Sequence, residues 1–195
     1  IDKKPGPLKI GQADGIACRT VEMFEAFGFS EKVLKESYWV NETTFWKPKI
    51  GESIGITRSS KIRDTEEGLS EYPHVILNQA RVHDFYLEMM YNGASQVVPF
   101  YEQELLDLKI DRSKDLPVTV ILKSTDTRTP ASHKNVRARF VVGCDGARSS
   151  VRKSLGRELH GDSANKAWGV MDVLATTNFP DIRLKSVVHS ASEGS

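Results

Sequence analysis

The chain has 195 residues, of which 39% are hydrophobic and 27% are charged, as expected of a globular protein that buries its own core. Its 27 basic residues balance 26 acidic ones, and the net charge of +1 argues against nucleic acid or a membrane surface as a partner. Two cysteines are too few for a disulfide framework, which favours a cytoplasmic protein, and no apolar run is long enough to span a membrane.

The first 71 residues predict two helices and two strands. In chain order we expect a loop over residues 5–11, a helix beginning at Asp14, a short helix over 30–36, strands over 38–47 and 53–58, and a charged surface loop over 61–71. Apolar residues between 16 and 27 follow the spacing of one helix face. Gly28 fits the position just after that helix, and Asp14 fits the capping position at its start.

The rest of the chain predicts a further mixture of helix and strand. We expect a helix over 78–93, strands over 97–101, 118–123, 137–143, 168–175 and 185–189, a hairpin loop over 125–135, and a helical turn over 149–155. Helices lie near strands at the start of the chain and around 78–155, whereas 38–60 and 168–190 have the character of antiparallel strands. This order predicts an α/β domain interleaved with a β-rich one.

The segment from Val141 to Arg152 combines a strand, an Asp-Gly turn and the start of a helix. Gly146 permits a close backbone approach or a positive φ. Asp145 is able to accept a hydrogen bond from a ribose hydroxyl, and the N–H groups near Ser149 suit a phosphate. The alternative is a plain strand–turn–helix corner in which Asp145 caps the helix.

Four sets of residues, one of them within this segment, carry a further signal when they are taken together. They are Gly143–Gly146 with Ser149 and Arg152, Ile10–Ile16 with Cys18–Glu22, Pro73–Val82, and Trp168–Asp172 with Asn178–Arg183. Together they resemble the flavin-dependent aromatic hydroxylases, which are single-component FAD monooxygenases. The resemblance is to the branch of phenol 2-monooxygenase and 3-hydroxybenzoate 4-monooxygenase, and it covers nearly the whole chain.

The resemblance implies a mixed α/β fold, in which a Rossmann-like FAD-binding domain is interleaved with an antiparallel substrate-binding sheet, as in p-hydroxybenzoate hydroxylase. Residues 1–37 and 76–162 would belong to the FAD-binding domain, and residues 38–75 and 163–195 to the substrate-binding domain. The sequence has no GxGxxG turn, which holds the FAD pyrophosphate in this family, and no later Gly-Asp-Ala segment. We therefore expect a fragment of a longer enzyme.

The activity that the resemblance implies is hydroxylation of a phenolic ring, of the phenol or 3-hydroxybenzoate type, by O₂. It would depend on FAD and NADPH and proceed through a flavin C4a-hydroperoxide, in a full-length enzyme that is a cytoplasmic homodimer. Two alternatives stay open. The first alternative is a non-catalytic fragment or remnant of such an enzyme. The second is a flavin tailoring oxygenase or epoxidase that acts on a different substrate.

The resemblance also assigns cofactor contacts residue by residue. It places Asp2 at the ribose hydroxyls, Lys3 at the adenosine, Gln12 and Ala13 at the flavin, Arg19 at the pyrophosphate or ribityl chain, Gln79 at the ribityl or phosphate region, and Asp145 and Gly146 near the FAD. The plain alternatives are a solvated carboxylate for Asp2 and a surface ion pair for Arg19. No spacing of histidines or cysteines indicates a metal site.

Three residues are candidates for the chemical step. Ionisation of a phenol enriches the ring in electrons, so a base near its hydroxyl is valuable, and we assign that base to Asp14, with the helix cap as the alternative. His74 would bind a substrate carboxylate or relay a proton, unless it is an ordinary surface or core histidine. Lys185 would supply positive charge to a phenolate or carboxylate, unless it only solvates the surface.

Overall fold

The computed structural model describes residues 1–51, 55–128, 130 and 132–190. The chain forms two compact units. The first unit comprises residues 1–7 and 87–170, and the second comprises residues 8–86 and 171–195.

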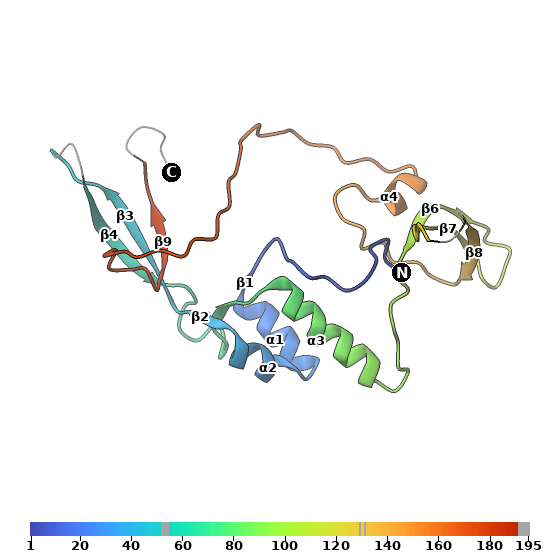
Figure 1. The fold of residues 1–195 in the computed structure, drawn as a ribbon, viewed down its shortest axis with the longest axis horizontal. Coiled ribbons are helices and arrows are strands. Elements are labelled where there is room, and N and C mark those ends of the chain that lie inside the picture. The colour runs from blue at the N-terminus through green and yellow to red at the C-terminus, as the bar shows by residue number, and fades with distance from the viewer. Residues whose placement is uncertain (52–54, 129, 131, 191–195) are drawn as a thin grey trace. The chain divides into compact units, whose positions relative to one another are not determined.

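The core of the second unit lies between three helices and a small sheet. The helices are α1 (Cys18–Ala26), α2 (Ser30–Glu36) and the first half of α3 (Gln79–Asn92), and they lie side by side in Figure 1. The sheet has the order β1-β5-β2, all antiparallel, with β1 at Gly15–Ile16, β2 at Tyr38–Val40 and β5 at His74–Ile76. The buried side chains between them are Val21, Phe24, Phe29, Val33, Val75, Leu77 and Phe85.

Glycine ends α1 as the sequence predicts. Gly28 has a φ of +80° and donates to the Glu25 carbonyl, while Phe29 donates to the Phe24 carbonyl, which is the Schellman arrangement. The rings of Phe24 and Phe29 stack with centroids 4.9 Å apart, so the turn also begins the core.

The start of α1 differs from the prediction. The helix begins at Cys18 and its capping residue is Ala17, whose side chain makes no capping hydrogen bond. The expectation that Asp14 caps this helix is therefore wrong. Gly15 and Ile16 pair instead with β5, because this pairing satisfies their backbone groups and buries Ile16 against the core.

A second sheet in the same unit has the order β4-β3-β9. Strand β3 (Glu42–Pro48) runs antiparallel to β4 (Ile56–Arg63) and parallel to β9 (Lys185–Val188). The single strand expected over 38–47 is two strands of different sheets, separated at Asn41. β4 extends into the expected surface loop, and the predicted start of its strand at 53 lies outside the described residues.

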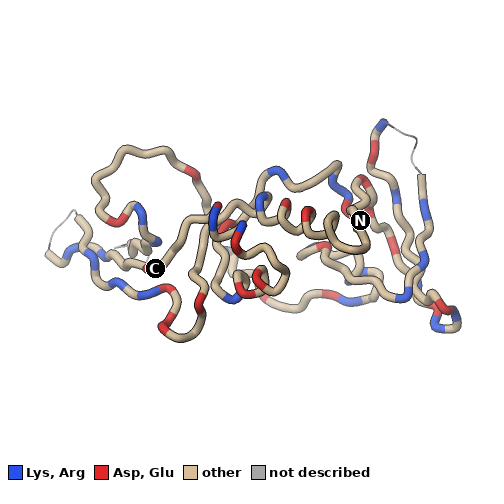
Figure 2. The backbone as a smooth tube through the Cα atoms, turned by 90° about the horizontal axis from the view of Figure 1, so that it is seen from below, with Lys and Arg blue, Asp and Glu red and all other residues tan. Residues whose placement is uncertain are grey.

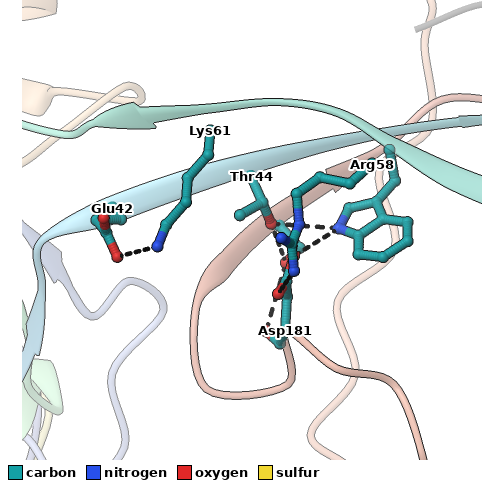
Figure 3. Close-up of polar contacts among 7 residues, drawn as sticks. Glu42, Thr44, Arg58, Lys61 and Asp181 are labelled. Carbon is teal, nitrogen blue, oxygen red and sulfur yellow. Dashed lines mark hydrogen bonds and ion pairs between the residues drawn. The ribbon is translucent and has the colours of Figure 1, made fainter.

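A buried carboxylate ties the segment before β9 to this sheet. Asp181 is 3% exposed and accepts hydrogen bonds from Trp46 Nε1 at 3.0 Å and Arg58 Nε at 2.8 Å, and Arg58 Nη2 contacts its other oxygen (Figure 3). The hydrogen bond from Arg58 lowers the pKa of Asp181, although burial opposes this. Glu42 and Lys61 form a separate ion pair across β3 and β4.

The first unit is built on an antiparallel meander. Its strands are β6 (Gln103–Ile110), β7 (Val118–Ser124) and β8 (His133–Ala138), in that order, and the short helix α4 (Ser150–Ser154) packs against β6. The alternate residues Val120 and Leu122 of β7 are buried, and Leu108 is buried opposite Val120. Two residues of the expected hairpin loop, 129 and 131, lie outside the described residues.

Two expected strands are absent from the described chain, and a third is only partly formed. Residues 97–101 and 168–175 have no strand structure, and of the strand expected over 137–143 only 137–138 belong to a strand, the end of β8. The apolar side chains of two of these segments are largely exposed: Phe140 87%, Val142 84%, Trp168 90%, Val170 92% and Leu174 106%. Strand character in the sequence produces a strand only where a neighbour accepts its hydrogen bonds, and no described segment pairs with residues 97–101, 139–143 or 168–175 in a sheet.

Charged side chains are mixed in sign along both units. Figure 2 shows basic and acidic positions interspersed on the backbone, in keeping with the net charge of +1. Among the residues that the structure describes, no helix has the length and apolar character needed to cross a membrane.

Candidate functional site

Four segments of the second unit meet at the carboxylate of Asp64. Its Oδ1 accepts hydrogen bonds from Thr43 Oγ1 at 2.8 Å and from Lys185 Nζ at 2.9 Å, and its Oδ2 contacts His74 Nδ1. Thr43 lies on β3 and is the register partner of Lys185 on β9, His74 lies on β5, and Asp64 follows β4. The structure thus brings together His74 and Lys185, two of the three residues predicted to be catalytic.

Asp64 is an anion held by its donors. Its side chain is 12% exposed, and those of His74 and Lys185 are 19% and 46% exposed. Burial raises the pKa of Asp64, but the hydrogen bonds from Lys185, Thr43 and His74 outweigh it and lower this pKa to about 2. An ionised carboxylate only accepts hydrogen bonds, so the Nδ1 atom of His74 carries a proton in this contact.

His74 lies on the face of the small sheet that points away from the helices. Val75 is buried in the core, and side chains alternate along a strand, so His74 and Ile76 share the opposite face. Tyr38 is the register partner of Ile76, and its hydroxyl donates to the Arg183 carbonyl. The segment before β9 is therefore held over this face.

A hollow of about 340 Å³ lies at this place. It is lined by Tyr38, Ile76, Ile182, Arg183, Leu184 and Lys185. Apolar and aromatic walls beside a lysine suit a small aromatic anion, because the walls would contact its ring and the lysine would pair with its charge.

Asp14 lies at the edge of the same sheet. Its carbonyl accepts the Leu77 N–H at 2.9 Å, and the next residue, Gly15, begins β1. A Cβ placed on Gly15 would lie 3.4 Å from His74 Nε2, so the free side of the imidazole faces this strand. The Asp14 side chain is exposed, and the structure assigns it no side-chain partner among the described residues.

Gln12, predicted to contact the flavin, and Gln79, predicted to contact the ribityl or phosphate region, are joined at the start of α3. The Gln12 N–H donates to Gln79 Oε1 at 2.9 Å, and Gly11 lies against the same glutamine. A Cβ on Gly11 would be only 2.4 Å from Gln79 Cβ, so glycine alone permits this approach. Both glutamines and the adjacent Ala13 are exposed.

Arg19 lies apart from those contacts on the surface of α1. Its side chain is 84% exposed and its guanidinium pairs with Glu22 at 2.8 Å, which is the surface ion pair considered as its alternative. Its cofactor role stays a prediction.

The four remaining candidates lie in the first unit. Asp145 accepts the backbone N–H groups of Ser150 at 2.6 Å and Val151 at 3.1 Å, and also the Ser149 hydroxyl, whose hydrogen bond lowers the Asp145 pKa. Asp145 thus binds the first backbone N–H groups of α4, close to the alternative that the sequence offered, although the capping residue itself is Ser149, whose hydroxyl oxygen accepts the Arg152 N–H. Gly146 has a φ of +76°, which explains the need for glycine there. The ribose contact of Asp145 stays a prediction.

The N-terminal segment is held against residues 100–103. Asp2 donates its backbone N–H to the Phe100 carbonyl at 2.9 Å, and its carboxylate accepts the Lys4 N–H at 2.9 Å. The Lys3 carbonyl accepts the Thr125 hydroxyl at 2.9 Å. Both Asp2 and Lys3 have exposed side chains, which leaves their predicted adenosine contacts open to test.

Sequence reasoning missed Asp64 and Asp181. Asp64 stands in the charged stretch 61–71, where several carboxylates look alike, and only the fold selects the one that meets His74. Asp181 lies in the segment 178–183, which carries part of the resemblance. The sequence therefore marked this segment, but it did not predict that Asp181 would be a buried ion-pair partner.

The family of the chain follows from comparison over its whole length. The profile of the family described as "FAD binding domain" matches residues 1–193. The chain belongs to this FAD-binding domain family. This confirms the resemblance drawn from its motifs.

Curated relatives agree with that assignment. The chain is 57% identical over 191 residues to a 3-hydroxybenzoate 4-monooxygenase of Comamonas testosteroni, covering 97% of this chain and 30% of the relative. It is 33% identical over 190 residues to a phenol 2-monooxygenase of Aspergillus fumigatus, again covering 97% and 30%. The chain thus spans about 30% of the length of these relatives.

Solved structures show the fold. The flavin-dependent monooxygenase PieE, in complex with FAD and substrate, matches 82% of this chain and 28% of its own with a TM-score of 0.63 at 21% identity. The p-nitrophenol 4-monooxygenase PnpA of Pseudomonas putida matches 79% of this chain and 36% of its own with a TM-score of 0.62 at 20% identity. The expected mixed α/β fold of flavin-dependent hydroxylases is confirmed.

Proposed function

We propose that the protein is an FAD- and NADPH-dependent monooxygenase that hydroxylates a phenolic ring of the 3-hydroxybenzoate type. The observation that carries this proposal is the 57% identity to a 3-hydroxybenzoate 4-monooxygenase along 97% of the chain. The grouping of His74 and Lys185 beside an apolar hollow supports it, because a substrate with a ring and a carboxylate needs both apolar walls and a cation.

The residues of the second unit fit one part of FAD. Gly11 lets its loop lie directly on Gln79, and the side chains of Gln12, Gln79 and Arg19 are exposed hydrogen-bond donors. Amide and guanidinium donors complement the hydroxyl and phosphate oxygens of a ribityl pyrophosphate. Bound FAD would supply the reduction and activation of O₂, for which no amino-acid side chain has the chemistry.

The chain's own residues would bind and ionise the substrate. Lys185 would pair with the substrate carboxylate, and Asp14 would accept the phenolic proton, since its exposed carboxylate is open to a ligand. The walls formed by Tyr38 and Ile76 would exclude water from the ring. We retain the cytoplasm and a homodimer as predictions for the full-length enzyme.

The test uses the natural protein in its full length, purified and loaded with FAD. NADPH oxidation, O₂ uptake and product formation are measured with 3-hydroxybenzoate, with phenol, which lacks the carboxylate, and with benzoate, which lacks the hydroxyl. We expect hydroxylation of 3-hydroxybenzoate with a high kcat/KM, a higher KM for phenol and no product from benzoate.

Other outcomes select the alternatives. A protein that retains FAD but hydroxylates a larger phenolic or polycyclic compound instead of 3-hydroxybenzoate would be a tailoring oxygenase. This alternative is relevant because a 39% identical relative in Aspergillus terreus has a name that specifies no substrate, FAD-dependent monooxygenase. A protein that takes up no FAD would be a non-catalytic remnant, and the proposal would fail.

A further inference from the structure

We propose that Asp64 is a positioning residue that fixes His74 as a proton acceptor at Nε2 and holds the Lys185 ammonium group beside it. This decides between the two roles that the sequence left open for His74, in favour of the proton relay. The reference to substrate rests on the proposed function, whereas the state of the imidazole does not.

The first support is the convergence of donors on one carboxylate. Thr43 and Lys185 both donate to Oδ1, which leaves Oδ2 to His74 Nδ1. The backbone of Asp64 is itself fixed, because its N–H donates to the Asn41 carbonyl at 3.0 Å. The carboxylate is therefore held from both its main chain and its side chain.

The second support is the direction of the imidazole. With Nδ1 bound to Asp64, Nε2 faces Gly15, where a Cβ would lie 3.4 Å away. Gly15 follows Asp14, the residue assigned as the base. A neutral imidazole protonated at Nδ1 has its lone pair at Nε2, on the side of that strand.

The third support is the balance of charge. The Asp64 carboxylate and the Lys185 ammonium sum to zero, so a proton arriving at Nε2 adds one positive charge next to a fixed anion. The proton that Asp14 takes from the substrate hydroxyl would be relayed to Nε2, and the imidazolium would be stabilised by its hydrogen bond to Asp64. The substrate becomes a phenolate with one more negative charge, and His74 becomes an imidazolium with one more positive charge.

The variant Asp64→Asn tests this arrangement because it reverses the direction of one hydrogen bond, the one between residue 64 and His74 Nδ1. Thr43 and Lys185 are donors, so they keep the amide oxygen at the Oδ1 position. The amide NH₂ then faces His74 Nδ1, which must accept. The imidazole is forced into the other tautomer, with its proton on Nε2.

The first measurement is the ¹⁵N NMR spectrum of His74 in the wild-type FAD-loaded enzyme, assigned with a His74→Gln sample. We expect the pattern of a neutral ring protonated at Nδ1 at the pH of the activity assay. A ring protonated at Nε2, or doubly protonated at that pH, would overturn the proposal, because neither form accepts a proton at Nε2. This result needs no active variant.

The second measurement compares kinetics. In Asp64→Asn we expect the His74 spectrum to change to the Nε2 tautomer and kcat to fall by about 100-fold, the size of a lost acid–base contribution, with a smaller change in KM. The control is Asp111→Asn in the first unit. Asp111 also has a pKa of about 2 and also binds a hydroxyl, from Ser113, and a lysine, but contacts no histidine among the described residues.

The outcomes separate the two proposals. If Asp64→Asn only lowers thermal stability, with the tautomer and kcat as in Asp111→Asn, then Asp64 is merely structural and this inference is wrong. If no phenol is hydroxylated by the wild type, the proposed function fails, while the wild-type spectrum still decides the placement of His74. If Asp64→Asn does not fold, the wild-type spectrum alone decides.

Discussion

Replacement of Gly11 by alanine tests the contact between the loop over 8–14 and helix α3. The added methyl group would lie 2.4 Å from Gln79 Cβ, 3.1 Å from its backbone N and 3.2 Å from its Cα. Ordinary contacts begin at about 3.4 Å, so the loop has to move away by about 1 Å. The backbone atoms of Gln79 belong to a helix and cannot yield as a flexible side chain would.

The expected cost has two parts. Overpacking of this kind costs about 1–3 kcal/mol. A displacement of that size also breaks the hydrogen bond from Gln12 N–H to Gln79 Oε1, now 2.9 Å, which contributes about 1 kcal/mol. A loss of 1.4 kcal/mol in binding is tenfold in affinity, so the displacement of Gln12 predicts an FAD Kd that is about 10–100-fold higher.

The assay pairs thermal unfolding of the FAD-free protein with FAD titration by flavin fluorescence. The matched control is Gly6→Ala, because a Cβ at Gly6 meets no atom within 4 Å. In a Gln79→Gly background the thermal penalty of Gly11→Ala should shrink, since the closest atom is gone. Wild-type stability and FAD affinity in Gly11→Ala would refute the close approach.

Other predictions concern the core and two carboxylates. Phe85→Ala, at a side chain 1% exposed, should lower the free energy of unfolding by about 3–5 kcal/mol in urea, whereas Tyr91→Ala on the same helix, 60% exposed, should change it by under about 0.5 kcal/mol. Asp181→Asn should lower the melting temperature, because Trp46 loses a charged hydrogen-bond acceptor. The difference in tryptophan fluorescence between the folded and the unfolded protein should also be smaller in this variant. The pKa of Asp64 is about 2 in the folded protein, against an ordinary 3.8, so the stability that its ionised form contributes is present above about pH 4 and is lost as the pH falls toward 2. The difference in melting temperature between the wild type and D64N should therefore become smaller over that pH range. A difference that stays constant would contradict this.

Local signals predicted the helices well. Gly28 and the apolar spacing fixed the end and the face of α1, and the same spacing located α3 to within a residue. These features depend on neighbours within one or two turns, which the sequence displays directly. The start of α1 was predicted too early because Gly15 and Ile16 pair with Ile76 and Val75 of β5, which lie far along the sequence.

Strands were harder because their partners are distant in sequence. Residues 168–175 have the composition of a strand, yet the described chain offers them no neighbour, and Trp168 is 90% exposed. The stretch over 38–47 has the same strand character throughout, but its two halves pair with different partners, β5 and β4. Composition identifies extended backbone, and only the fold assigns its register.

Asp64 and Asp14 differ in how far their carboxylates are open to a ligand. Asp64 is surrounded by three donors and its pKa is about 2, so it stays an anion and cannot take up a proton near neutral pH. Asp14 is exposed at the sheet edge, beside the strand that His74 Nε2 faces. Two acids with such different surroundings suit different tasks, one holding the imidazole and the other meeting the substrate. Sequence reasoning selected Asp14, whose catalytic role stays a prediction, and only the fold identified Asp64 as the acid that contacts His74 and Lys185.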